Sequence, residues 1–131
     1  MTIGTVLIVE SQEDARKAMA EWLEDAGFEV LLCPGPGEPD YVCLGGRGMA
    51  CPLAEPADVV VVSMRLRSDD MMQGTPGWVL LSYYANQGKR VIALTGSRDS
   101  VHPLGDEQVT VLTRPVDRAD LIDAVAVLAH R

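Results

Sequence analysis

The stretch DVVVVSMRL, residues 58–66, decides which fold the sequence is expected to adopt. Its four consecutive valines are β-branched, and a continuous apolar run of this length is typical of a strand that is buried on both faces of a sheet. Such strands occur where helices cover both sides of a parallel sheet. Ser63 follows the valines directly, where the strand is expected to emerge, and is the first candidate for a functional side chain.

Four more apolar runs of strand length accompany this stretch. The five predicted strands cover residues 5–9, 28–33, 58–62, 90–96 and 108–114. Apolar residues at helical spacing predict three helices, which end before Gly27, end before Gly88 and run from Arg118 to about Ala129. Strands that alternate with helices or other connections predict a doubly wound α/β fold with a mostly parallel sheet.

Residues with suitable chemistry stand at the predicted helix starts. Ser11 and Asp14 resemble a capping box, so Ser11 is expected to cap the first helix. Thr75 and Pro76 suit the N-cap and the first position of the second helix, and Asp117 suits the N-cap of the last.

Length and charge restrict the classes of function. A chain of 131 residues suits a single domain over 1–131, with no separate effector domain. The net charge of −8 and the scattered basic residues argue against binding to nucleic acid or to an anionic membrane. The N-terminus has neither the basic start nor the apolar length of a signal peptide, and no run reaches the roughly 18 apolar residues of a membrane helix. A cytoplasmic protein is expected.

In a sheet of this kind, ligands bind beyond the carboxyl ends of the strands. The residues that emerge there are Glu10, Ser11, Ser63, Met64, Thr95, Gly96, Arg114 and Pro115.

The order and spacing of four motifs resemble the CheY-like receiver domain of two-component response regulators. These motifs are VLIVES, ADVVVVSMRL, VIALTG and LTRPVDRADLIDAV, and the resemblance covers essentially the whole chain. It implies a flavodoxin-like fold with a five-stranded parallel sheet in the order 2-1-3-4-5. It also implies a role in two-component or phosphorelay signalling, with a kinase or a regulator as protein partner.

The resemblance places several residues at the receiver phosphorylation site. The matching positions are Glu10, Ser11, Ser63, Met64, Thr95 and Arg114, with Val111 at the aromatic switch position. Glu10 keeps a carboxylate, but Ser11 replaces the second acid of the usual pair. Ser63 replaces the aspartate that accepts the phosphoryl group, and Arg114 replaces the usual lysine.

These replacements remove the groups that phosphoryl transfer needs. Mg²⁺ prefers hard oxygen ligands and is usually held by one or two carboxylates, so tight Mg²⁺ binding is not expected where Glu10 is the one remaining acid. Ser63 has no neighbouring histidine or lysine in the pattern to remove its proton. Arg114 is expected to form an ion pair with Glu10. The sequence therefore predicts a pseudo-receiver that is not an enzyme and acts through contact with a protein.

The connection after the second predicted strand departs from the receiver pattern. Its helix is expected to be largely replaced by a loop rich in cysteine, glycine and proline, and the fourth receiver helix is interrupted by Pro103 and Gly105. Cys33, Cys43 and Cys51 match no common zinc or iron–sulfur spacing, so no cofactor is expected. Two alternatives stay open: a thiol- or metal-based sensor that uses these cysteines, and a residual phosphoacceptor with non-standard chemistry. Contact with a second copy of the chain, as a homodimer, is also open.

Overall fold

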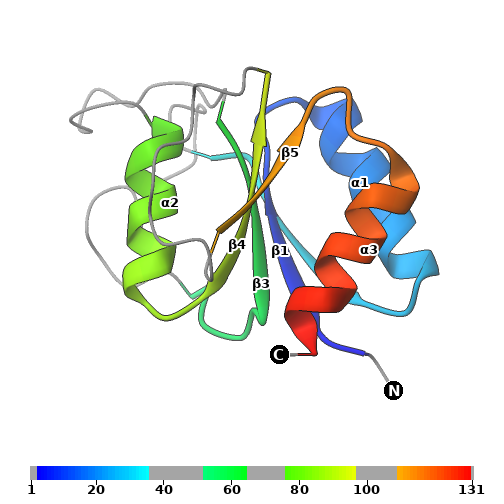
Figure 1. Ribbon diagram of the computed structural model, residues 1–131, viewed down its shortest axis with the longest axis horizontal. Helices are drawn as coiled ribbons and strands as arrows, with labels where there is room; N and C mark the ends of the chain where they lie inside the picture. Colours follow the sequence, from blue (N-terminus) through cyan, green and yellow to red (C-terminus); the bar gives the residue numbers. More distant parts are fainter. Residues whose placement is uncertain (1–2, 36–51, 65–75, 97–108, 131) are drawn as a thin grey trace.

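The computed structural model describes residues 3–35, 52–64, 76–96 and 109–130, which form a five-stranded parallel sheet with helices on both faces (Figure 1). The elements in chain order are β1 (Thr5–Val9), α1 (Glu13–Asp25), β2 (Glu29–Cys33), β3 (Val59–Ser63), α2 (Pro76–Asn86), β4 (Arg90–Thr95), β5 (Val109–Thr113) and α3 (Arg118–Ala129). The strand order is β2-β1-β3-β4-β5, which confirms the predicted topology. The predicted interruption of the fourth receiver helix, and most of the predicted loop after β2, lie outside the described residues.

The central strand β3 is buried on both faces. Val59 to Val62 are each 0 % exposed, and β3 pairs in parallel with β1 on one side and β4 on the other. Because side chains alternate along a strand, Val60 and Val62 face one layer while Val59 and Val61 face the other. Full burial of a valine contributes about 1.5–3 kcal/mol relative to exposure. The four valines thus explain why this sheet needs helices on both sides.

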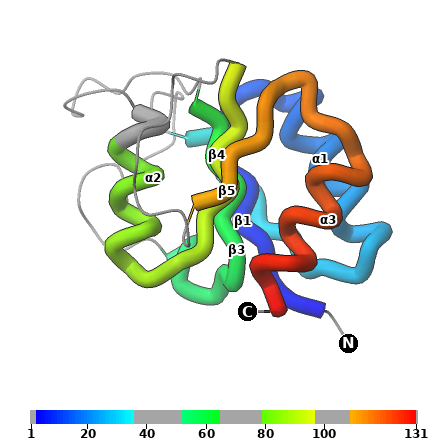
Figure 2. The backbone as a smooth tube through the Cα atoms, in the orientation of Figure 1, coloured from blue at the N-terminus to red at the C-terminus, as the bar shows by residue number. Residues whose placement is uncertain are grey.

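Different helices form the two layers of the core. Figure 2 shows α2 on one side of the sheet, and α1 and α3 together on the other. Leu80, Leu81 and Tyr84 of α2 pack against the first face, and the turn before β3 adds Ala54 and Ala57. Leu23 of α1 and Leu121 of α3 are among the residues that cover the second face. None of the helices in the described part of the chain has the length and apolar character needed to cross a membrane.

Two turns depend on glycine. Gly27 follows α1 with a φ of 101°, and Gly88 follows α2 with a φ of 78°. Side chains with a Cβ rarely adopt this left-handed conformation, so glycine ends both helices where the sequence predicted. A Cβ at Gly27 would lie 3.0 Å from Cδ1 of Ile3, whereas one at Gly88 would meet nothing within 4 Å.

The start of α1 differs from the prediction. The helix begins at Glu13 with Gln12 at the N-cap, and the Gln12 side chain makes no capping hydrogen bond. Ser11 therefore lies one position too early to cap the helix, and the expected capping box with Asp14 is wrong by one residue. The backbone N–H of Ser11 instead donates to Oε2 of Glu10 at 3.0 Å. The prediction for the last helix is confirmed, because Oδ2 of Asp117 accepts from the N–H groups of Ala119 and Asp120.

Several predicted strand boundaries differ from the structure by one residue, and hydrogen bonds explain two of the differences. Phe28 was predicted to open the second strand, but its N–H donates to the carbonyl of Leu23 and so belongs to the end of α1. Asp58 precedes β3 and uses its Oδ2 to accept the N–H of Thr5 at 2.8 Å. Its side chain therefore ties the beginning of β3 to the beginning of β1.

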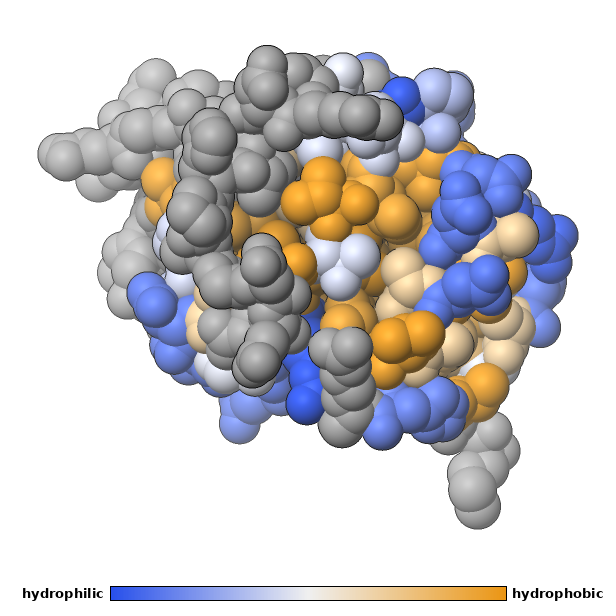
Figure 3. Space-filling view, in the orientation of Figure 1, coloured by the Kyte–Doolittle hydropathy of each residue, from blue (hydrophilic) through white to orange (hydrophobic). Residues whose placement is uncertain are grey.

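One face of the molecule is apolar at its centre. In Figure 3 hydrophobic side chains gather where Figure 1 draws β4 and β5, and charged side chains lie over the helices to the right. Val111, in the middle of β5, is 42 % exposed, and Val127 of α3 is also exposed. The predicted switch position is thus an accessible part of an edge strand.

Replacement of Gly27 by alanine should lower the free energy of unfolding by about 1–2 kcal/mol, because the left-handed backbone crowds a Cβ against the following carbonyl. Gly88→Ala should cost a similar amount for the same reason. Urea unfolding at constant m-value measures both changes. Gly96→Ala is the matched control, since its Cβ would meet nothing within 4 Å and its φ is not left-handed. Equal losses in all three variants would contradict the backbone explanation.

Removal of the α3 cap should be more costly than removal of the Ser11 hydroxyl. Asp117→Ala leaves the N–H groups of Ala119 and Asp120 without their carboxylate acceptor and should cost about 1 kcal/mol. Ser11→Ala should change stability by a few tenths of a kcal/mol or less, because Ser11 stands outside the N-cap of α1. Thermal and urea unfolding measure the loss of stability in the two variants. A larger loss for Ser11→Ala than for Asp117→Ala would support Ser11 as the cap of α1.

Candidate functional site

Polar residues meet where the parallel strands end. Glu10 follows β1, Ser63 ends β3, Thr95 ends β4 and Arg114 follows β5. Glu10 is 1 % exposed, and Ser63 and Thr95 are 0 % exposed. These three are the polar residues buried in the described part of the chain, and the sequence placed all of them at this edge. A buried polar group is costly unless it is hydrogen-bonded, so the contacts of these side chains define what the site can do.

Arg114 is the side chain that joins three of the strand ends. Its Nη2 donates to the carbonyl oxygen of Leu94 at 3.0 Å and lies 3.3 Å from Oγ of Ser63, while its Nη1 lies 3.4 Å from the same hydroxyl. Hydrogen bonds of this kind are strongest near 2.9 Å, so the bond to Leu94 is the stronger contact and the two to Ser63 are weaker. The guanidinium thus braces β3 and β4 from the end of β5.

The backbone around Arg114 makes the same connections. Its N–H donates to the carbonyl of Thr95 at 2.8 Å, and the N–H of Met64 donates to the carbonyl of Leu94 at 2.9 Å. The oxygen of Leu94 therefore accepts from both Met64 and Arg114. The Arg114–Pro115 peptide bond is cis. The main chain holds Ser63, Met64 and Thr95 in fixed positions relative to the guanidinium.

Glu10 is enclosed by a second set of bonds. Its Oε2 accepts the N–H of Ser11, its own N–H donates to the carbonyl of Cys33 at 3.0 Å, and its carbonyl accepts Nη1 of Arg16 at 2.8 Å. Sequence reasoning missed Arg16. The feature that could have pointed to Arg16 is its positive charge close to the start of α1, where the helix dipole favours acidic residues. The expected ion pair between Glu10 and Arg114 stays a prediction.

The contact of Ser63 with Arg114 does not activate its hydroxyl as a nucleophile. Activation of a serine hydroxyl requires a base within hydrogen-bond reach. Arg114, which reaches the hydroxyl, carries donors and no acceptor, and its guanidinium is not deprotonated in proteins. It therefore holds the Ser63 oxygen as an acceptor and offers nothing that could remove its proton.

The described residues do not fit the Mg²⁺ ion that the receiver resemblance implies. Such a site needs several hard oxygen ligands, with carboxylates to balance the charge. Among the described residues, Glu10 supplies the one carboxylate of this polar group, and its Oε2 accepts the N–H of Ser11. Among the residues that the structure describes, no cluster of three or more histidine, cysteine, aspartate or glutamate side chains is arranged to hold a metal.

The proposed thiol site is described only in part. Cys33 ends β2, is buried, and its Sγ accepts the N–H of Gly35 at 3.4 Å. Cys43 and Cys51 lie outside the described residues, so the sensor alternative stays a prediction.

Comparison with known proteins places this geometry in a familiar architecture. No family model and no curated protein matches the sequence. Solved structures do match its fold. The receiver domain protein from Clostridium thermocellum has 20 % identity and a TM-score of 0.70, covering 98 % of this chain and 95 % of the other. The CheY-like receiver domain protein from Methanospirillum hungatei JF-1 has 24 % identity and a TM-score of 0.68, with coverage of 98 % and 95 %.

A third similar structure comes from a larger signalling protein. The receiver domain of the hybrid histidine kinase CckA has 21 % identity and a TM-score of 0.64, covering 96 % of this chain and 99 % of the other. The five parallel strands in the order 2-1-3-4-5 with helices on both faces make up the fold that this chain shares with these structures. The chain therefore has the fold of a CheY-like response regulator receiver domain.

Proposed function

We propose that this chain is a receiver-like signalling module that acts by contact with a protein partner and is not phosphorylated on aspartate. The contact between the Arg114 guanidinium and the Ser63 hydroxyl carries the proposal. Ser63 ends the strand that carries the acceptor carboxylate in receivers. Arg114, which lies beside it, donates hydrogen bonds to the oxygen of its hydroxyl group. A cation and a hydroxyl at this point satisfy each other without a phosphoryl group or a metal.

The proposed mode of action is binding and not catalysis. The described edge offers the carboxylate of Glu10, the hydroxyl groups of Ser11, Ser63 and Thr95, and the guanidinium groups of Arg16 and Arg114. None of the contacts described for them sets a base beside a nucleophile. The net charge of −8 favours a protein partner over nucleic acid, because phosphate neutralisation requires clustered basic residues. A kinase or another regulator of a two-component pathway is the class of partner that the resemblance to receiver domains supports.

Incubation with acetyl phosphate and Mg²⁺ should leave the intact mass of the protein unchanged, because Ser63 and not a carboxylate stands at the end of the central strand. Mass spectrometry would detect a gain of roughly 80 Da for one phosphoryl group. A receiver domain with its acceptor aspartate is the positive control in the same incubation. A variant that combines Ser11→Asp, Ser63→Asp and Arg114→Lys tests whether the missing groups account for the inactivity. Phosphorylation of the unmodified chain would contradict the proposal.

Arg114→Met should destabilise the fold by about 1–3 kcal/mol, because it removes the donor from the Leu94 carbonyl and from the buried Ser63 hydroxyl. Arg114→Lys should cost less, since an ammonium keeps the charge but loses the fork geometry. Urea unfolding measures both. Arg118→Met is the matched control, because Arg118 is exposed and lies 3.8 Å from Asp25. If Arg118→Met lowers the free energy of unfolding as much as Arg114→Met does, the contacts of Arg114 do not explain its effect on stability.

A double-mutant cycle tests the expected ion pair between Glu10 and Arg114. If the two side chains interact, the losses of Glu10→Gln and Arg114→Met should not add, and the coupling should exceed about 0.5 kcal/mol. Additive losses would mean that Glu10 is held by Ser11 and Arg16 without help from Arg114.

A further inference from the structure

The strand β5 lies at one side of the sheet and pairs with a single neighbour, β4. No residue of β5 is buried, whereas five of the six residues of β4 are buried. Three of the five residues of β5 are nevertheless apolar, and Val111 at its centre is 42 % exposed. Strands of a parallel sheet are normally covered on both faces. β5 is therefore an apolar strand whose covering is incomplete.

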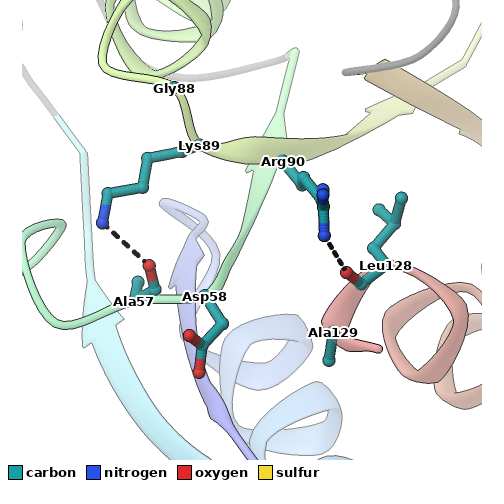
Figure 4. A pocket seen from close by; sticks show the side chains of 7 residues that line it. All are labelled: Ala57, Asp58, Gly88, Lys89, Arg90, Leu128 and Ala129. Atoms are coloured by element: carbon teal, nitrogen blue, oxygen red, sulfur yellow. Dashed lines mark hydrogen bonds between the residues drawn. The ribbon is translucent and has the colours of Figure 1, made fainter. Parts of the chain in front are cut away.

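The helices α2 and α3 are centred on the strands beside β5. Both make their main contacts with the sheet at β3 and β4. Arg90, the first residue of β4, donates through Nη1 to the carbonyl of Leu128 at 2.9 Å, beside a hollow that Lys89 also lines (Figure 4). This bond ties the end of α3 to β4. In Figure 3 apolar side chains are accordingly visible where Figure 1 draws β5.

Hydrogen bonds to β4 determine which backbone groups of β5 point away from the sheet. The N–H of Arg114 donates to the carbonyl of Thr95. In a parallel ladder, alternate residues of a strand direct both their N–H and their C=O to the same neighbouring strand. Residues two and four positions before Arg114 therefore bond to β4. The residues between them direct N–H and C=O outward: Val109, Val111 and Thr113.

The outward groups of β5 match those of a second copy of the same strand. When two copies run antiparallel about a two-fold axis at Val111, Val111 faces its own copy and Val109 faces Thr113 of the second copy. Each residue of these pairs has an outward N–H and an outward C=O, so every pair can exchange two hydrogen bonds. Valine and threonine are β-branched, which favours contact between side chains across the two strands.

β5 also lacks the features that keep the edges of sheets apart. Proteins usually prevent edge pairing with charged side chains, prolines or bulges. β5 contains no charged residue and no proline, and its register with β4 is continuous. The opposite edge strand, β2, carries the exposed Glu29. In a chain with a net charge of −8, β5 thus offers a second copy a surface without like charges in direct opposition.

We propose that two copies of this chain associate through β5, paired antiparallel about Val111, so that two five-stranded sheets become one continuous sheet. Main-chain hydrogen bonds supply the affinity when a strand is added to a sheet edge. Because only five residues pair, the dimer forms weakly and its population rises with protein concentration. The inference is independent of the function proposed for the carboxyl edge.

Amide hydrogen exchange tests the pairing residue by residue. The N–H of Val111 should exchange more slowly as the protein concentration rises, because the second copy protects it. The N–H of Leu112, which bonds to β4, is the internal control and should be protected at every concentration. Sedimentation velocity over the same range should show a reversible monomer–dimer equilibrium. A chain that stays monomeric, or a Val111 exchange rate that does not depend on concentration, would overturn the proposal.

Substitutions at the two edge strands test where the copies meet. Val111→Pro removes an outward N–H, a change that an edge strand accepts. It should weaken dimerisation by about tenfold or more, because the two-fold axis removes the hydrogen bond twice. Leu32→Pro is the matched control: Leu32 is 41 % exposed on β2, and its N–H also points outward because the N–H of Glu29 donates to Gly4. Leu32→Pro should leave the dimer unchanged.

A second pair of variants decides the matter if proline disturbs folding, which circular dichroism reveals. Val111→Lys places two like charges across the two-fold axis and should abolish the dimer, whereas Leu32→Lys should not affect it. A dimer that withstands Val111→Lys, or one that Leu32→Lys weakens equally, does not form through β5 and contradicts the proposal.

Discussion

The burial of β3 on both faces is the constraint on which the rest of the structure depends. Four fully buried valines require one layer over Val60 and Val62 and another over Val59 and Val61. α2 supplies the first layer, while α1 and α3 supply the second. Parallel pairing of β3 with β1 and β4 then brings the ends of all three strands to one edge. The position of Ser63 beside Leu94 and Thr95 is therefore a consequence of the core.

Charge balance supports the pseudo-receiver that we propose for this edge. A receiver site with several carboxylates needs a metal ion, since clustered negative charges repel one another. In the proposed pseudo-receiver, where serines stand at two of these positions, a divalent cation would have fewer anions to hold it. A single guanidinium is sufficient to satisfy a buried hydroxyl and a carbonyl, as Arg114 does with Ser63 and Leu94. Ser11, Ser63 and Arg114 thus form one self-consistent set.

Much of this arrangement could be predicted from local sequence patterns. Apolar runs and helical spacing predicted the order of the elements. The expectation that ligands bind beyond the carboxyl ends of parallel strands located Glu10, Ser63 and Thr95. The start of α1 could not be predicted as well, because Ser11 and Gln12 differ by a single position and tertiary contacts decided between them. The bond from Arg16 to Glu10 and the hollow beside Lys89 join segments whose proximity only the folded chain reveals.

The cations at the two edges of the sheet donate hydrogen bonds to different acceptors. Arg90 begins β4 and Thr95 ends it, and five steps of a strand at about 3.3 Å each separate them by roughly 17 Å. Both ends of β4 belong to a sheet whose core valines leave no room for a second packing. Coupling between sites requires an element with two states, which a strand fixed on both faces does not provide. A change of contacts at the amino edge should therefore leave the contact between Arg114 and Ser63 unchanged.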